Sequence, residues 1–233
     1  MIRRLIKSSK HHSSEEKNNE NIFFVINVFG ANLYEKPTLD SKVIKNIKIG
    51  ESILANKTLK ISQTIYIGTR FQLTGNFVQV KNQIYSGFIH SSDLTRFKPK
   101  LEPIYEDISI PDFKGKIIQK TTNKRIEVFN NHEYEIEEEI TTYENVIHTY
   151  TNFGDCFEHT CLYKYMTLPE VYHQLPVHNP KIDVTPKGNF ILMPEFIKKT
   201  DNKYDFKGRG ITRSISIIKN KDQQYLISSL DCP

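Results

Sequence analysis

The sequence has no tryptophan, only three cysteines and no apolar run of the roughly 18 residues that a membrane-spanning helix needs. We therefore expect no membrane span. Cys156, Cys161 and Cys232 are an odd number, which fits either free thiols or one disulfide with a third cysteine left over. Clustered arginines with interleaved aromatic residues, the usual footprint of a nucleic-acid surface, are also missing, so we expect no nucleic-acid partner.

Motifs for several kinds of chemistry are missing as well. Gly208-Arg209-Gly210 lacks the rest of a phosphate-binding fingerprint and is better interpreted as a turn. No Gly-x-Ser-x-Gly nucleophile elbow occurs, and the glutamates of residues 133–139 lack the spacing of a calcium loop. The sequence therefore predicts no cofactor and favours a protein that is not an enzyme.

The N-terminal residues 1–20 are polar and show no hydrophobic period, which predicts a disordered tail. Residues 1–10 are basic, but no long apolar segment follows them, so they do not form a secretory signal as they stand. For the chain as given this predicts a cytoplasmic protein, or one of the cell envelope if the true start lies upstream. Residues 21–98 carry ten basic and four acidic side chains, against seventeen and twenty in residues 99–233. This difference predicts an anionic partner for the first region, or docking of the two regions.

Residues 21–98 alternate between short apolar runs and turn residues, which predicts a small β-barrel. Apolar runs at 22–29 and 41–49 open the region, and residues 77–80 and 84–89 close it. Gly87 lies inside the last strand, where a missing side chain allows another backbone to approach. Residues 91–94 predict a polar turn with one short helical turn. Residues 60–74 predict an added hairpin with Gly68 near its tip.

This pattern resembles the bacterial SH3-like domain. The segments that carry the resemblance are Asn32-Leu33, Pro37, residues 41–44, Gly50, residues 77–80 and Gly87-Phe88-Ile89, all in the family's order. Two features depart from the family: Phe77 stands where a tryptophan is usual, and residues 58–74 are longer than the usual link. The resemblance implies that Phe77 is a buried core residue. It also implies recognition of a peptide, a cell-wall fragment or a partner protein, because loops beside the sheet carry binding in such barrels. Our candidate ligand-binding residues are Tyr34, Tyr66, Arg70 and Tyr85.

Residues 99–115 contain three prolines and several acidic residues, which favours an extended linker that could pair along a sheet edge. Residues 116–233 then predict seven or eight short strands, including 124–129, 132–140, 145–150, 157–165, 189–193, 211–219 and 224–230, with one helical turn at 168–174. We expect an antiparallel sandwich or barrel of unassigned family. The predicted class is thus all-β: a disordered tail at 1–20, an SH3-like barrel at 21–98 that folds alone, a linker at 99–115 and a strand-rich domain at 116–233.

The segment 155–161 holds Asp, Cys, Glu and His within seven residues and could suggest a metal site. On a strand, however, its side chains alternate between faces, and a second cysteine pair is missing, so we predict no metal there. Asp155-Cys156 also resembles the start of the nucleophile motif in papain-like cell-wall peptidases. The residues that follow are Phe157-Glu158 rather than Ser-Gly, and the strand at 212–217, where the histidine should stand, contains none. A bacterial binding protein is therefore our main hypothesis, and a cell-envelope cysteine hydrolase using Cys156 with a histidine is the alternative.

Overall fold

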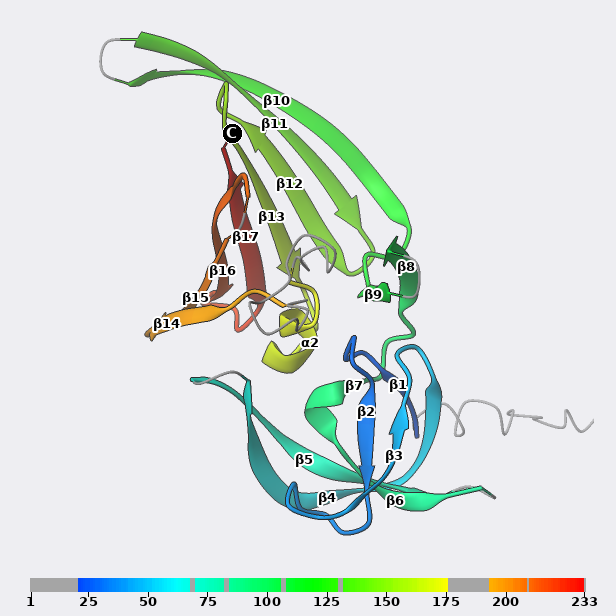
Figure 1. Cartoon of the computed structure of the whole chain (residues 1–233). Helices are drawn as coiled ribbons and strands as arrows, with labels where there is room; N and C mark the ends of the chain where they lie inside the picture. Colours follow the sequence, from blue (N-terminus) through cyan, green and yellow to red (C-terminus); the bar gives the residue numbers. More distant parts are fainter. Residues whose placement is uncertain are drawn as a thin grey trace, which may run out of the picture.

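The computed structural model describes residues 21–67, 70–81, 84–105, 108–129, 132–175, 193–208 and 210–232. The predicted tail at 1–20 and most of the predicted strand at 189–193 lie outside these residues. Nearly all the described secondary structure is antiparallel β-strand, with one 3₁₀ turn and one short α-helix (Figure 1). The predicted all-β class is confirmed.

The first region forms a seven-stranded sheet in the order β3-β2-β6-β5-β4-β1-β7, which curls on itself (Figure 1). Its elements are β1 (Ile22–Val25), β2 (Ala31–Tyr34), β3 (Val43–Ile47), β4 (Ser52–Ile67), β5 (Phe71–Lys81), β6 (Ser86–His90), η1 (Ser91–Asp93) and β7 (Leu94–Thr95). Alternate residues face inward and form a core that includes Val25, Leu33, Ile47, Val78 and Ile89. The expected hairpin arm is present, because Ile67 of β4 pairs with Phe71 of β5.

The first apolar run ends its strand earlier than the sequence pattern suggests. The side chain of Asn27 accepts a hydrogen bond from the backbone N–H of Phe29 (3.0 Å), which closes a tight turn directly after β1. Gly30 follows with a φ of 81°, a left-handed conformation that favours glycine. The chain therefore reverses at 26–30, and Phe29 is left 60% exposed instead of lying in a strand.

Phe77 is fully buried, as its place in the pattern predicts. Its ring lies edge-on to Tyr34, with 6.0 Å between ring centroids, and to the His90 ring at 5.4 Å. Phe77 therefore packs against side chains of β2 and β6 on the sheet face opposite Val78, whose side chain belongs to the core that includes Leu33 and Ile89.

Gly87 lies where β6 runs beside β2. A Cβ atom on this residue would lie 2.5 Å from the backbone oxygen of Tyr34 and 3.0 Å from the Leu33 side chain. We expect Gly87→Ala to lower the free energy of unfolding by roughly 1–3 kcal/mol, the usual cost of overpacking. Urea denaturation measures this loss, and Ser86→Ala, at the exposed neighbouring position, is the control. Equal stability of the two variants would show that β2 and β6 can separate without cost.

Residues 99–115 are more ordered than a linker. β8 (Lys100–Tyr105) and β9 (Ile108–Asp112) pair with each other in a two-stranded antiparallel sheet. Each strand of such a ribbon has one edge without a ladder partner, so Pro103 and Pro111 can occupy it despite lacking an N–H group.

The second region forms one eight-stranded sheet in the order β10-β11-β12-β13-β17-β16-β15-β14. Its strands are β10 (Ile117–Phe129), β11 (His132–Tyr143), β12 (Val146–Asn152), β13 (Phe157–Tyr163), β14 (Phe196–Thr200), β15 (Lys203–Lys207), β16 (Thr212–Lys219) and β17 (Tyr225–Asp231). The long hairpin of β10 and β11 extends beyond the other strands (Figure 1). α2 (Leu168–Tyr172) follows β13, with Pro169 in its first turn, as predicted.

The glutamate-rich segment is a strand, as predicted for residues 132–140, and its charged partners lie on the neighbouring strand. Lys124 lies 3.0 Å from Glu135 and 3.2 Å from Glu137 across the β10–β11 hairpin. The lysine-rich strands β14 and β15 lie at the other end of the sheet. The adjacent strand β10 of the same hairpin therefore supplies the lysine and arginine partners of these glutamates.

A single hydrophobic core joins the two sheets. Ile26, Phe71 and Leu73 of the first region pack in one cluster with residues of the second, among them Phe113, Tyr163, Tyr172, Leu175, Phe206 and Ile215. α2 lies between the curled sheet and the larger sheet (Figure 1). The hairpin arm β4–β5 therefore contributes its inward side chains to the contact between the sheets.

Candidate functional site

The contact between the two sheets is fixed by a buried glutamate of α2. Glu170 accepts hydrogen bonds from the backbone N–H and the hydroxyl of Thr167 (2.7 and 2.8 Å), which caps the helix. Its other carboxylate oxygen accepts a hydrogen bond from the Thr95 hydroxyl of β7 (2.6 Å). Because one carboxylate caps α2 and bonds to the first sheet, it fixes the position of the residue that ends the helix, His173.

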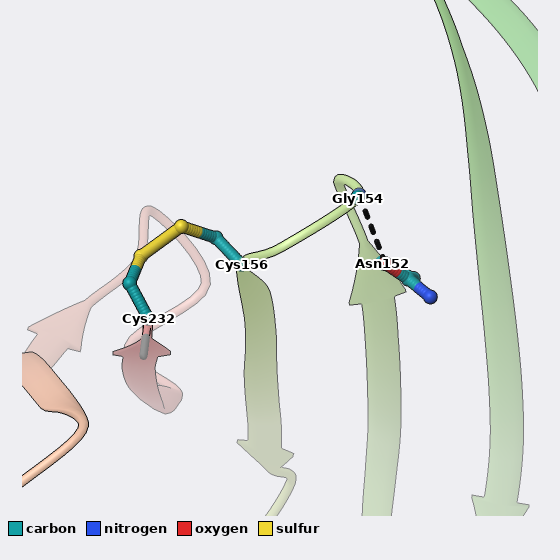
Figure 2. The surroundings of a disulfide bond; sticks show 4 residues. All are labelled: Asn152, Gly154, Cys156 and Cys232. Atoms are coloured by element: carbon teal, nitrogen blue, oxygen red, sulfur yellow. Dashed lines mark hydrogen bonds between the residues drawn. A yellow bond between two sulfur atoms is a disulfide. The ribbon is translucent and has the colours of Figure 1, made fainter.

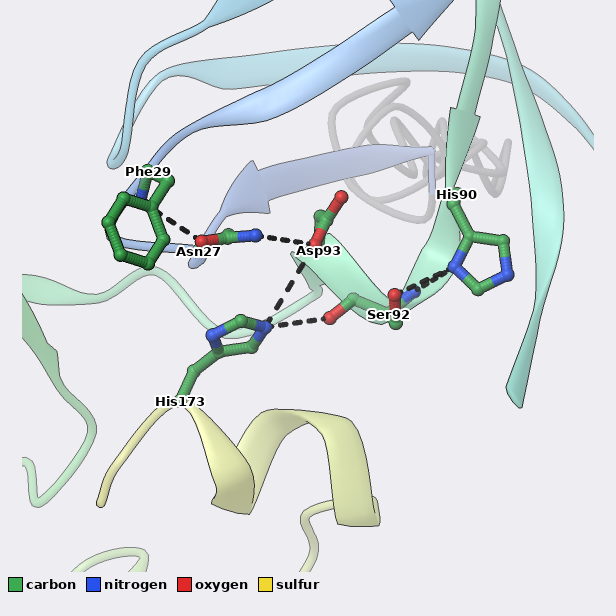
Figure 3. Close-up of polar contacts among 6 residues, drawn as sticks. All are labelled: Asn27, Phe29, His90, Ser92, Asp93 and His173. Carbon is green, nitrogen blue, oxygen red and sulfur yellow. Dashed lines mark hydrogen bonds and ion pairs between the residues drawn. The ribbon is translucent and has the colours of Figure 1, made fainter. Parts of the chain in front are cut away.

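His173 lies against η1 of the first region (Figure 3). Its Nε2 is 3.1 Å from the backbone oxygen of Ser92 and 4.0 Å from Oδ1 of Asp93. A carbonyl oxygen can only accept a hydrogen bond, so Nε2 carries the proton and Nδ1 has a free lone pair. Asp93 Oδ1 in turn accepts a hydrogen bond from Asn27 Nδ2 (2.9 Å). Residues 27, 93 and 173 thus meet although they are far apart in the chain.

η1 is itself held by a second histidine. His90 Nε2 donates to the backbone oxygen of Gln63 (3.1 Å), and its Nδ1 lies 2.7 Å from the Ser92 hydroxyl (Figure 3). Burial lowers the pKa of His90 and keeps its imidazole neutral. The turn that carries Asp93 is therefore anchored to β4 through neutral hydrogen bonds.

Burial changes the ionisation of both groups that face each other in this site. The pKa of Asp93 is raised to about 6 by burial, and its hydrogen bond from Asn27 only partly offsets this effect. The pKa of His173 is lowered to about 4, also by burial, against a smaller opposing effect of its bond to Ser92. At pH 7 the site therefore holds a carboxylate beside a neutral imidazole.

Two polar atoms at the end of α2 are left without hydrogen-bond partners. Within the described part of the chain, the Tyr172 hydroxyl and His173 Nδ1 are buried and unpartnered. Buried polar atoms are usually paired, so such atoms mark a place where a ligand or water can bind.

These groups line a cleft of about 390 Å³ between the barrel and α2, which we call the Asp93 cleft. Its described lining comprises Asn27, Phe29, Gly30, Asn32, Tyr34, Asn46, Ile65, Tyr66, Ile67, Leu73, Ser92, Asp93, Tyr172, His173 and Met193. Two residues proposed from the sequence, Tyr34 and Tyr66, meet here. Tyr34 is buried, and Tyr66 is 64% exposed. The volume lies in the range of small-ligand sites.

The other two proposed residues lie elsewhere. Arg70 lines a second cleft of about 570 Å³, which we call the Arg70 cleft, between the β4–β5 hairpin and β14. Lys198 and Lys199 also line it, and the described lining contains no acidic side chain. Tyr85 packs beside the barrel core, with Lys45 Nζ 5.2 Å from its ring centroid, and lines neither cleft.

The cysteines form one disulfide. Cys156, just before β13, is bonded to Cys232, just after β17, as Figure 2 shows. Cys161 is a free thiol, and burial raises its pKa, which disfavours the reactive thiolate. Of the two arrangements that the odd count left open, the structure therefore has one disulfide and one remaining thiol. The hydrolase hypothesis needs a free Cys156 at a helix N-terminus, whereas here the residue is bonded and precedes a strand.

The Asp93–His173 pair also differs from a nucleophile-activating dyad. Its protonated Nε2 donates to a backbone carbonyl, and no serine or cysteine hydroxyl or thiol is hydrogen-bonded to Nδ1 in the described structure. The described residues contain no group of three side chains that could hold a metal ion. What the arrangement can do is bind a group that donates hydrogen bonds.

Sequence reasoning placed Asp93 in the polar turn at 91–94 and His173 in the helical turn at 168–174, and assigned neither a role. No local motif joins them, because their proximity depends on the packing of α2 against η1. The one available signal was that Asp93 is among only four acidic residues in residues 21–98.

Comparisons with known proteins add no relative. No protein-family model matches the chain, and neither the curated proteins nor the solved structures give a match. None of the helices in the described residues has the length and apolar character needed to cross a membrane.

Proposed function

We propose that this chain is a non-enzymatic binding protein that recognises a peptide segment of a partner at the junction of its two sheets. The observation that carries the proposal is the Asp93 cleft, which is lined by an exposed tyrosine, Tyr66, and by the partly exposed carboxylate of Asp93. Its walls come from both regions, so the ligand would contact the barrel and α2 together. The resemblance of residues 21–98 to SH3-like domains supports the same class of function.

The Arg70 cleft extends the proposed surface. The β4–β5 hairpin contributes residues to both clefts, with Tyr66 lining the Asp93 cleft and Arg70 the other. Arginine can hold a carboxylate in a two-pronged grip, and Lys198 and Lys199 add positive charge beside it. A peptide with side chains of both signs would therefore find complementary groups on either side of this hairpin.

The test is binding of capped peptides of varied charge, measured by isothermal titration calorimetry. We expect Tyr66→Ala to weaken binding at least about fivefold, because exposed aromatic residues supply much of the energy in such surfaces. Tyr165→Ala, a 71% exposed tyrosine that lines neither cleft, is the matched control and should leave affinity unchanged. Equal affinity of wild type and Tyr66→Ala for every bound peptide would place the binding surface elsewhere.

A further inference from the structure

Asp93 is the only charged side chain among the described residues that line the Asp93 cleft. The other polar groups are neutral: three asparagines, one serine, three tyrosines and His173, whose pKa of about 4 leaves it uncharged at pH 7. The cleft therefore carries one negative charge that no lining residue neutralises. An isolated buried carboxylate costs free energy, so a cationic partner here would be strongly favoured.

The aromatic residues of the cleft suit the same kind of ligand. Phe29 and Tyr66 are 60% and 64% exposed, so their rings are accessible from the opening. Tyr34 lies deeper in the same wall. A cation attracted by a carboxylate is further stabilised by the faces of aromatic rings within about 6 Å.

The hydrogen-bond acceptors of the cleft need donors. Asp93 Oδ1 accepts a hydrogen bond from Asn27, no described bond occupies Oδ2, and 13% of the Asp93 side chain remains exposed. A primary ammonium group carries three donors and no acceptor, so it matches this set. A neutral amide would supply fewer donors and no charge.

We propose that the Asp93 cleft binds the ammonium group of a lysine side chain in the peptide ligand. This inference rests on the proposed peptide-binding function and names the group that the cleft selects. The four-carbon stem of lysine would lie along Ile65, Ile67 and Leu73 in the apolar wall while its head reaches Asp93.

A pH dependence follows from the groups around Asp93. The ionisable side chains that face it are His173 and Tyr172 from α2, Tyr34 from β2 and Tyr66 from β4, and His90 lies on the far side of η1. His173, with its pKa of about 4, stays neutral between pH 5 and 7, while burial lowers the pKa of His90 and raises the pKa of Tyr172. Asp93, with its pKa of about 6, loses its charge in this interval. Lysine-peptide binding should therefore weaken about tenfold between pH 7 and pH 5.

The experiment titrates the full chain with two probes, the capped tripeptide Ala-Lys-Ala and the same peptide with its lysine acetylated. We expect the lysine peptide to bind at least about tenfold more tightly at pH 7, and Asp93→Asn to abolish both this preference and its pH dependence. Asp40→Asn, at an exposed carboxylate of the barrel that lines neither cleft, should keep both. Thermal unfolding verifies that each variant is folded.

Each other outcome overturns the inference in a recognisable way. Equal affinity of the two peptides would remove the ammonium as the selected group while leaving the proposed peptide-binding function in place. A preference that survives Asp93→Asn would assign the cation to another site. Failure of both probes to bind at 5 mM, roughly the weakest affinity such a titration detects, would overturn the lysine assignment, and the wider peptide panel with Tyr66→Ala would then decide the function separately.

Discussion

Replacing Phe71 by alanine should lower the free energy of unfolding by about 3–5 kcal/mol, the usual cost of removing a buried aromatic ring. Phe71 is 1% exposed, and four aromatic rings of the second region surround it. Ring centroids lie at 4.8 Å for Tyr172, 5.3 Å for Phe196 and Phe206, and 5.7 Å for Tyr204. The Phe71 ring belongs to the β4–β5 arm and its neighbours to α2 and the larger sheet, so the loss should affect both regions.

Urea denaturation followed by far-UV circular dichroism and by tyrosine fluorescence measures this effect, since the chain has no tryptophan. Phe29→Ala, at a 60% exposed phenylalanine of the same region, is the control and should change stability by less than about 0.5 kcal/mol. We expect one coincident transition for wild type by both probes. Two separated transitions, or a loss below about 1 kcal/mol in Phe71→Ala, would show that the two sheets are stabilised independently.

The sequence pattern predicts that residues 21–98 fold alone, and the packing of Phe71 against the second region bears on that prediction. A fragment with these bounds would expose Phe71, Leu73 and Ile26, which are buried against the second region in the whole chain. Its strands also contain a separate core around Leu33 and Val78. We therefore expect such a fragment to be less stable than the same region in the full chain, even if it folds.

Local pattern predicted those features that depend on neighbouring residues. The β4–β5 hairpin, the helical turn at 91–93 and the close approach at Gly87 all follow from alternation, turn chemistry or a missing side chain. Each involves strands that are adjacent in the sheet. The period of two likewise distinguished the glutamate-rich strand β11 from a helix.

Features that depend on distant packing were not predictable in this way. Phe71 alternates like any strand residue, and nothing near it in the sequence shows that its neighbours would be rings more than 100 positions away. β14 and β15 are short and rich in lysine, so they carried no hydrophobic period. The Asp93 cleft combines the turn after β1 with η1 and α2, and its chemistry becomes visible only when His173 is placed beside Ser92 and Asp93.

The second large effect is expected at Asp93, where a substitution should stabilise the protein. Burial raises the pKa of this carboxyl from 3.8 to about 6, so the folded state binds a proton that the unfolded state releases between these values. Stability therefore falls as pH rises through this interval, and above pH 6 the ionised carboxylate costs roughly 3 kcal/mol. Asp93→Asn removes the charge but keeps an oxygen that can accept the hydrogen bond from Asn27 Nδ2.

Asp93→Asn should accordingly be about 3 kcal/mol more stable than wild type at pH 7 and less than about 1 kcal/mol more stable at pH 4. His173 has the opposite dependence, because its pKa of about 4 lies below its ordinary value of 6.5 and its stabilising contribution is lost as pH falls. In wild type the opposite effects of Asp93 and His173 on the free energy of unfolding nearly cancel between pH 4 and 6.5. In Asp93→Asn only the effect of His173 remains, so the stability of this variant should fall as the pH is lowered through this interval. Urea denaturation at several pH values, with Asp40→Asn as control, measures both curves. If Asp93→Asn is no more stable than wild type at pH 7, the carboxylate is already compensated within the fold, and the reason for expecting a cationic ligand beside it disappears.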